Sequence, residues 1–83
     1  MLKSREEILQ MIKGIMQEMF EIDPSEVNLD AHLQNDLDFD SIDAVDMIVK
    51  LKELTGQAVK PEDFKNSRTV NDVVEAMYKL LNG

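Results

Sequence analysis

The feature that most constrains the fold is a helical spacing of apolar residues, which recurs in three segments. Ser4 and Glu7 precede the first segment with the spacing of a capping box, which marks a helix start. Asp23 predicts its end, because a residue before a proline avoids the α region. The apolar residues of this first face are Ile8, Met11, Ile12, Ile15, Met16, Met19 and Phe20.

The second segment runs from about Ser41 to Thr55, with Asp40 as its expected cap and Gly56 as its expected end. Its side chains divide into three arcs at helical spacing. A core arc holds Ala44, Met47, Ile48, Leu51 and Leu54, a polar arc holds Asp43, Asp46, Lys50 and Glu53, and a third apolar strip holds Ile42, Val45 and Val49. The strip borders the acids, so it is either a protein-docking site or a surface that the preceding loop buries.

Thr69 and Asp72 form a second capping box. The third apolar face follows it, with Val70, Val73, Val74, Met77, Leu80 and Leu81. A short fourth helix is expected near Pro61, since proline suits the first helical position. No segment alternates as a strand does. We therefore predict an all-α fold, a small four-helix bundle of three longer helices and one short helix, as a single domain over residues 1–83.

Residues 21–39 show no sustained period and predict a long loop between the first two helices. A loop of this length in so small a domain is usually functional. We expect four spaced apolar residues to tie it to the core: Val27, Leu29, Leu33 and Leu37.

Composition excludes several kinds of site. The chain has no cysteine and one histidine, which excludes disulfides, thiolate zinc sites and histidine-rich metal sites. We interpret His32 as ordinary loop packing. The formal net charge of -8 argues against nucleic acid and anionic membranes, and favours a basic protein partner. Without an apolar run long enough to span a membrane, or a signal-peptide core, we expect no membrane insertion and a cytoplasmic location.

The stretch from residue 36 to residue 46 holds five carboxylates and one hydroxyl, that of Ser41. Three of the acids fit the first, third and fifth positions of a calcium loop, but Ser41 replaces its glycine and Met47 its glutamate. We therefore expect no metal site. Catalysis by a serine nucleophile would need a base, and the only histidine lies nine residues upstream. The chain is thus expected not to be an enzyme.

Two interpretations remain for Ser41. It is either an ordinary residue at a helix start or the acceptor of a phosphate-linked group. A phosphodiester at this position would be stabilised by the helix dipole. The flanking acids would oppose an anion, so they make better sense as contacts for a basic partner.

The order of these elements resembles that of the acyl carrier proteins of the free-standing type II kind. The resemblance covers about residues 7–81. It rests on the first helix, the long loop and three short motifs: Asp38-Phe39-Asp40-Ser41-Ile42-Asp43 at a helix start, Pro61-Glu62-Asp63-Phe64 near a short helix, and Thr69-Val70-Asn71-Asp72 opening the last helix. The resemblance implies that Ser41 bears 4'-phosphopantetheine, transferred from coenzyme A by a phosphopantetheinyl transferase. The thiol of that arm would hold acyl intermediates as thioesters and present them to enzymes of fatty-acid or polyketide-type biosynthesis.

The resemblance also implies two sets of site residues. The surface read by basic patches of a ketosynthase and other acyl-processing enzymes would comprise Asp40, Ile42, Asp43, Val45, Asp46 and Val49. The acyl-chain pocket would comprise Leu33, Leu37, Ile48, Leu51, Val59 and Phe64. The protein would act as a monomer without catalysis of its own.

Several residues depart from the familiar fatty-acid carriers. Asp38-Phe39 replaces a pair of small residues, Ile42 replaces leucine, and Ser67 replaces an apolar residue; Lys50 and Lys52 also place positive charge on a helix that is usually acidic. These departures favour a specialised pathway, such as a polyketide-like, aryl polyene or modified-lipid system. Two alternatives stay open: an unmodified helical adaptor that uses the Ile42, Val45 and Val49 strip, and a carrier of aminoacyl or peptidyl groups.

Overall fold

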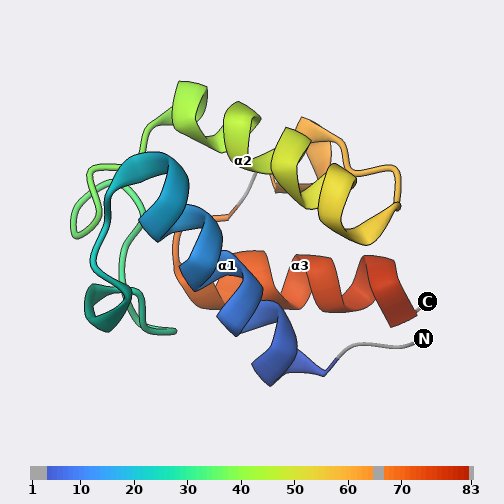
Figure 1. Cartoon of the computed structure of the whole chain (residues 1–83), viewed down its shortest axis with the longest axis horizontal. Coiled ribbons are helices and arrows are strands. Elements are labelled where there is room, and N and C mark those ends of the chain that lie inside the picture. The colour runs from blue at the N-terminus through green and yellow to red at the C-terminus, as the bar shows by residue number, and fades with distance from the viewer. Residues whose placement is uncertain (1–3, 65–66, 83) are drawn as a thin grey trace.

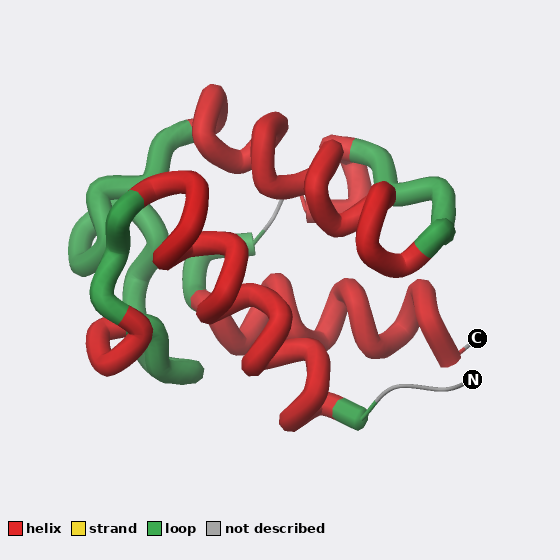
Figure 2. Tube along the Cα trace, in the orientation of Figure 1, coloured by secondary structure: helices red, strands yellow, loops and turns green. Residues whose placement is uncertain are grey.

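The computed structural model describes residues 4–64 and 67–82, apart from the side chains of Ser41 and Asp63. Its elements are α1 (Arg5–Phe20), α2 (Ser41–Thr55), α3 (Val70–Asn82) and two 3-10 turns, η1 (Pro24–Glu26) and η2 (Pro61–Phe64) (Figure 1). The described part of the chain contains no strand, so the all-α prediction is confirmed (Figure 2). No helix in it is long and apolar enough to cross a membrane.

The predicted fourth helix is wrong, because the segment at Pro61 is a 3-10 turn of four residues. The Phe64 carbonyl at its end accepts from the Ser67 N–H at 3.0 Å. So short a segment closes i→i+3 bonds rather than an α-helical ladder. The fold is therefore three α-helices with two connecting 3-10 turns.

Helix α1 begins as predicted and ends earlier than predicted. The Ser4 hydroxyl accepts from the Glu7 N–H at 3.2 Å, and the Glu7 carboxylate accepts from the Ser4 N–H at 3.4 Å. The helix ends at Phe20 because Glu21 takes a left-handed conformation, with φ of 57°, which reverses the chain before Pro24 is reached. Asp23 instead caps η1 by accepting from the Ser25 N–H at 2.9 Å.

The predicted C-terminus of α2 and the predicted N-terminus of α3 are both confirmed. Each is set by residues close to it in the sequence. Gly56 ends α2 with φ of 70°, and its N–H donates to the Lys52 carbonyl at 2.9 Å. At the start of α3, the Asp72 carboxylate accepts from the Thr69 N–H at 3.2 Å, and the Thr69 hydroxyl accepts from the Asp72 N–H at 3.3 Å. Both are standard devices that satisfy backbone groups at helix ends.

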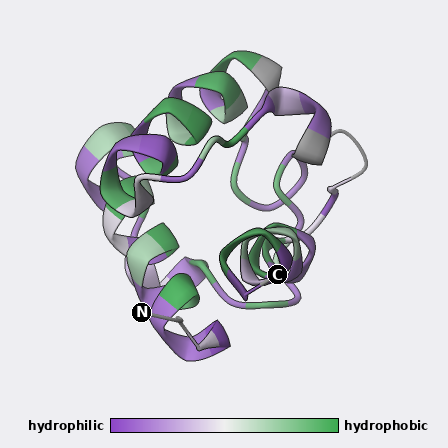
Figure 3. Cartoon of the chain, turned by 90° about the vertical axis from the view of Figure 1, so that its right-hand side faces the viewer, coloured by the Kyte–Doolittle hydropathy of each residue, from purple (hydrophilic) through white to green (hydrophobic). Residues whose placement is uncertain are grey.

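The three apolar faces meet in one core, and Figure 3 shows that each helix has an apolar and a polar side. Met19 and Leu54 are exceptions: both were expected in the core and both are exposed. Each lies in the last turn of its helix. The helical residues that are buried are Ile8, Ile12, Ile15 and Met16 of α1, Met47, Ile48 and Leu51 of α2, and Val70, Val73, Val74 and Met77 of α3.

The long loop is tied to the core by Val27, Leu33 and Leu37, which are buried. Leu29 was expected to do the same, but its side chain is exposed and only its carbonyl is engaged, accepting from the Asn71 N–H at 3.1 Å. The loop also runs beside the segment that leads into α3. There the Leu33 N–H donates to the Arg68 carbonyl at 2.9 Å, and His32 forms an isolated bridge with Thr69.

Candidate functional site

The N-terminus of α2 is closed by a reciprocal cap. One oxygen of the Asp40 carboxylate accepts from the N–H groups of Ile42 and Asp43, at 3.0 Å each. The Asp43 carboxylate accepts in return from the Asp40 N–H at 3.4 Å. Ser41 is thus the first residue of α2, and two of the donors that a helix start would offer an anion are already taken. The Ser41 side chain itself lies outside the described part of the structure.

The segment before the cap is held by a compact turn that starts at His32. The Asp36 carboxylate accepts from the His32 N–H at 2.7 Å, and the N–H groups of Asp36 and Leu37 donate to the His32 carbonyl. Asp36 therefore closes this turn. Asp38 has a positive φ of 53°, a conformation that favours glycine and that aspartate tolerates better than most residues.

Phe39 fixes the position of the cap. Its side chain is buried, and its N–H donates to the Leu33 carbonyl at 2.7 Å. Its ring packs edge-on against that of Phe20, at the end of α1. Because Phe39 is held by both contacts, Asp40 and the start of α2 are presented at the surface by a firmly packed residue.

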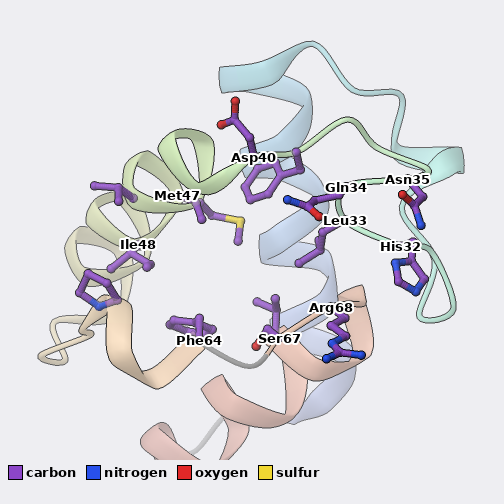
Figure 4. A pocket seen from close by; sticks show the side chains of 15 residues that line it. His32, Leu33, Gln34, Asn35, Asp40, Met47, Ile48, Phe64, Ser67 and Arg68 are labelled. Carbon is purple, nitrogen blue, oxygen red and sulfur yellow. The ribbon is translucent and has the colours of Figure 1, made fainter.

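A cavity of about 480 Å³ opens beside this helix start. It lies between α2, η2, the start of α3 and the loop that precedes α2 (Figure 4). Its apolar wall is formed by Leu33, Phe39, Ala44, Val45, Met47, Ile48, Pro61, Phe64 and Val73, and its polar side chains are those of His32, Gln34, Asn35, Asp40, Ser67 and Arg68. A mostly apolar cavity with a few polar groups has the character of a small-molecule site.

The structure brings together three of the six residues expected in an acyl pocket. Leu33, Ile48 and Phe64 stand on the cavity wall. Leu37, Leu51 and Val59 are buried in the core without lining the cavity.

Sequence reasoning did not assign Phe39, Met47 and Val73 to the cavity wall, although all three line it. Phe39 carried a signal, since it is a large apolar residue where the resemblance led us to expect a small one. Met47 and Val73 carried none, because helical spacing marks a residue as inward-facing without saying whether it meets a cavity.

The surface strip of Ile42, Val45 and Val49 is open to solvent. Their exposed fractions are 72%, 48% and 52%, so the long loop does not cover them. Asp46 beside them is exposed, and Asp43 is half-buried. Val45 also lines the cavity, which makes it the residue that joins the strip to the cavity.

Residues 10–77 match the family model described as the phosphopantetheine attachment site. This chain belongs to the acyl carrier protein family. It is 56% identical over 75 residues to acyl carrier protein 2 of Ralstonia nicotianae, an alignment that covers 90% of this chain and 93% of the relative. It is 38% identical to the acyl carrier protein of Rhodococcus erythropolis over 96% of this chain and 88% of the relative. The meromycolate extension acyl carrier protein of Mycolicibacterium aurum is 36% identical over 96% of this chain and 82% of its own length.

The predicted family, the carrier function and the cofactor 4'-phosphopantetheine are thereby confirmed. The site is compatible with that cofactor. Asp40 and Val45, which flank the start of α2, both line the cavity, so an acyl chain on an arm attached nearby would meet an apolar wall. At the start of α2, the helix dipole would favour the negative charge of the phosphate that links the arm.

Proposed function

We propose that Ser41 is the residue of this acyl carrier protein that takes the phosphopantetheine arm. The observation that carries the proposal is the position of Ser41 as the first residue of α2, beside the cavity and between Asp40 and Ile42, which are both exposed. The Ser4 hydroxyl already caps α1 by accepting from the Glu7 N–H, and the Ser25 hydroxyl already donates to the Asp23 carboxylate. Ser67 lies half-buried on the cavity wall.

The proposed modification is a phosphoryl transfer. The Ser41 oxygen bonds to the phosphorus that carries the pantetheine of coenzyme A, and the bond from that phosphorus to the rest of the nucleotide breaks. Adenosine 3',5'-bisphosphate leaves, and the hydroxyl proton passes to a base of the transferase. The arm supplies a thiol on which acyl groups are held as thioesters, which this cysteine-free chain does not itself offer.

We further propose that the cavity receives the acyl chain. Its inner wall includes Leu33, Met47 and Ile48, which are all buried. Leu37, Leu51 and Val59 support this wall from the core rather than touching the chain. Burying apolar chain atoms here is favourable by about 25 cal/mol per Å² removed from water.

The partner enzymes would dock on α2. Ile42, Val45 and Val49 offer an apolar contact, and Asp40, Asp43 and Asp46 offer negative charge to a basic patch. Such a combination steers the approach of the partner and fixes its register. We expect the phosphopantetheinyl transferase, a ketosynthase and other acyl-processing enzymes to use this surface. The carrier would work in the cytoplasm as a monomer without catalysis of its own.

Peptide mapping tests the attachment site. Trypsin cleaves after lysine and arginine, and none lies between Lys13 and Lys50, so residues 14–50 are released as one peptide with two serines, Ser25 and Ser41. After treatment with coenzyme A and a transferase, fragment ions should place the added group on Ser41. Ser25 serves as the internal control, and modification there would contradict the proposal.

A further inference from the structure

The cavity wall has an apolar part and a polar part. A site that bound only a fully reduced acyl chain would not require the polar part. Leu33, Met47 and Ile48 make one part apolar. Ser67 and Gln34 belong to different segments, one before α3 and one in the long loop, and both bring polar groups to the cavity (Figure 4).

Ser67 is a polar residue on the mostly apolar cavity wall. It is half-buried and stands in the chain between Phe64 and Val73, which both line the cavity. Its N–H is held by the Phe64 carbonyl. Its hydroxyl has no hydrogen bond within residues 4–64 and 67–82.

The other described serine and threonine hydroxyls all have partners. Those of Ser4 and Thr69 accept from backbone N–H groups at helix starts, at 3.2 and 3.3 Å. Those of Ser25 and Thr55 donate to the Asp23 carboxylate and the Leu51 carbonyl, at 2.9 and 2.7 Å. The Ser67 hydroxyl is therefore the one among them that is left for water or a ligand.

The Ser67 hydroxyl, unpaired among the described residues, affects how favourably different acyl chains can fill the cavity. A saturated chain would displace water from it and leave it unsatisfied, which is unfavourable for a buried polar group. A chain that carries an oxygen at that point would restore the bond, since a serine hydroxyl both donates and accepts. At the cavity rim, the exposed Gln34 and Arg68 offer further N–H donors to a carbonyl oxygen.

We propose that this cavity selects acyl chains that keep hydroxyl or keto oxygens over fully reduced chains, and that Ser67 is a specificity-determining residue. The proposal rests on attachment of the arm at Ser41. The enzymes that consume the product of this carrier would then act on partly reduced intermediates, and complete reduction would not take place before release.

Two substitutions at Ser67 whose new side chains have nearly the same shape distinguish the effect of the hydroxyl from the effect of side-chain volume. Ser67→Thr keeps the hydroxyl and Ser67→Val replaces it with a methyl group. The wild type and both variants are loaded from the corresponding coenzyme A thioesters with a saturated eight-carbon chain, or with chains hydroxylated at the third, fifth or seventh carbon. Intact mass confirms each loading, and thermal unfolding then measures how far each chain stabilises the fold.

In the wild type and in Ser67→Thr, at least one hydroxylated chain should raise the Tm by about 4–8 °C more than the saturated chain. In Ser67→Val the saturated chain should give the larger rise. If both variants respond alike to every chain, or if the saturated chain stabilises the wild type most, the selectivity proposal is overturned while attachment stands. If no mass is gained at Ser41, attachment fails and this proposal fails with it.

Discussion

The ring of Phe39 stands edge-on to the ring of Phe20, with centroids 5.1 Å apart and planes at 83°. The contact joins the residue before the α2 cap to the last residue of α1. Edge-to-face pairs contribute about 0.5–1.5 kcal/mol beyond the area that they bury. The position of the α2 cap beside Ser41, the proposed attachment residue, therefore depends on a contact between segments about twenty residues apart in the sequence.

We predict that Phe39→Ala lowers the free energy of unfolding by about 3 kcal/mol, because it removes a buried ring that also lines the cavity. Urea denaturation measures this loss. Phe39→Leu is the control, since it keeps most of the apolar volume and should cost less. A loss below about 1 kcal/mol for alanine would show that the loop does not depend on this anchor.

The two acids after Ser41 should behave differently. Asp43 accepts from the Asp40 N–H and so belongs to the cap, whereas no hydrogen bond is found for the exposed Asp46 carboxylate among the described residues. Asp43→Asn should lower stability by about 0.5–1 kcal/mol as well as weaken binding to a basic partner. Asp46→Asn should weaken binding alone. Equal melting temperatures for the two variants would contradict the role of Asp43 in the cap.

Substitutions at Val45 and Val49 should distinguish partner docking from binding of the acyl chain. Both are exposed on α2, but only Val45 lines the cavity. We predict that serine at either position lowers kcat/KM of the transferase, by roughly tenfold where the contact is central to the interface. Only Val45→Ser should also reduce the rise in Tm that an attached chain gives. A matching loss of chain stabilisation in Val49→Ser would show that the strip and the cavity are not distinct.

Asp72 should make stability depend on pH. Its carboxylate accepts from the N–H groups of Arg68 and Thr69, and these bonds hold its pKa below the usual value of 3.8. A lowered folded-state pKa adds stability above the unfolded pKa, and this stability is lost as pH falls through the folded value. Asp72→Asn should therefore unfold at a lower temperature than wild type at pH 7. The gap should narrow below about pH 4, and a constant gap would contradict the assignment.

Local signals in the sequence predicted the helix starts well. Ser4, Asp40 and Thr69 act through bonds to residues two or three positions away, so their function is readable from spacing alone. The strip of Ile42, Val45 and Val49 on α2 was predicted for the same reason, since helical spacing fixes which side chains share a face. Its exposure to solvent was left open by the sequence and is shown by the structure. The end of α1 was placed too late because Glu21 adopts a left-handed conformation. That conformation usually belongs to glycine, and the sequence has no glycine there.

The cavity could not be predicted in the same way. Its wall combines Leu33, Ile48 and Val73, which come from the long loop, α2 and α3 and meet only after the helices pack. Whether an inward residue meets the core or a cavity depends on that packing, which is why Leu51 and Ile48 share an arc and only Ile48 lines the cavity. The free hydroxyl of Ser67 was likewise visible only once the partners of the other hydroxyls were known.

Attachment of the phosphopantetheine arm at Ser41 is tested most directly by intact mass. The wild type, Ser41→Ala and Ser25→Ala are incubated with coenzyme A and an active broad-specificity transferase, and their intact masses are compared. The wild type and Ser25→Ala should each gain the mass of one phosphopantetheine, while Ser41→Ala gains none. An unchanged wild-type mass, with a control carrier modified in the same reaction, or a full gain in Ser41→Ala, would contradict the claim.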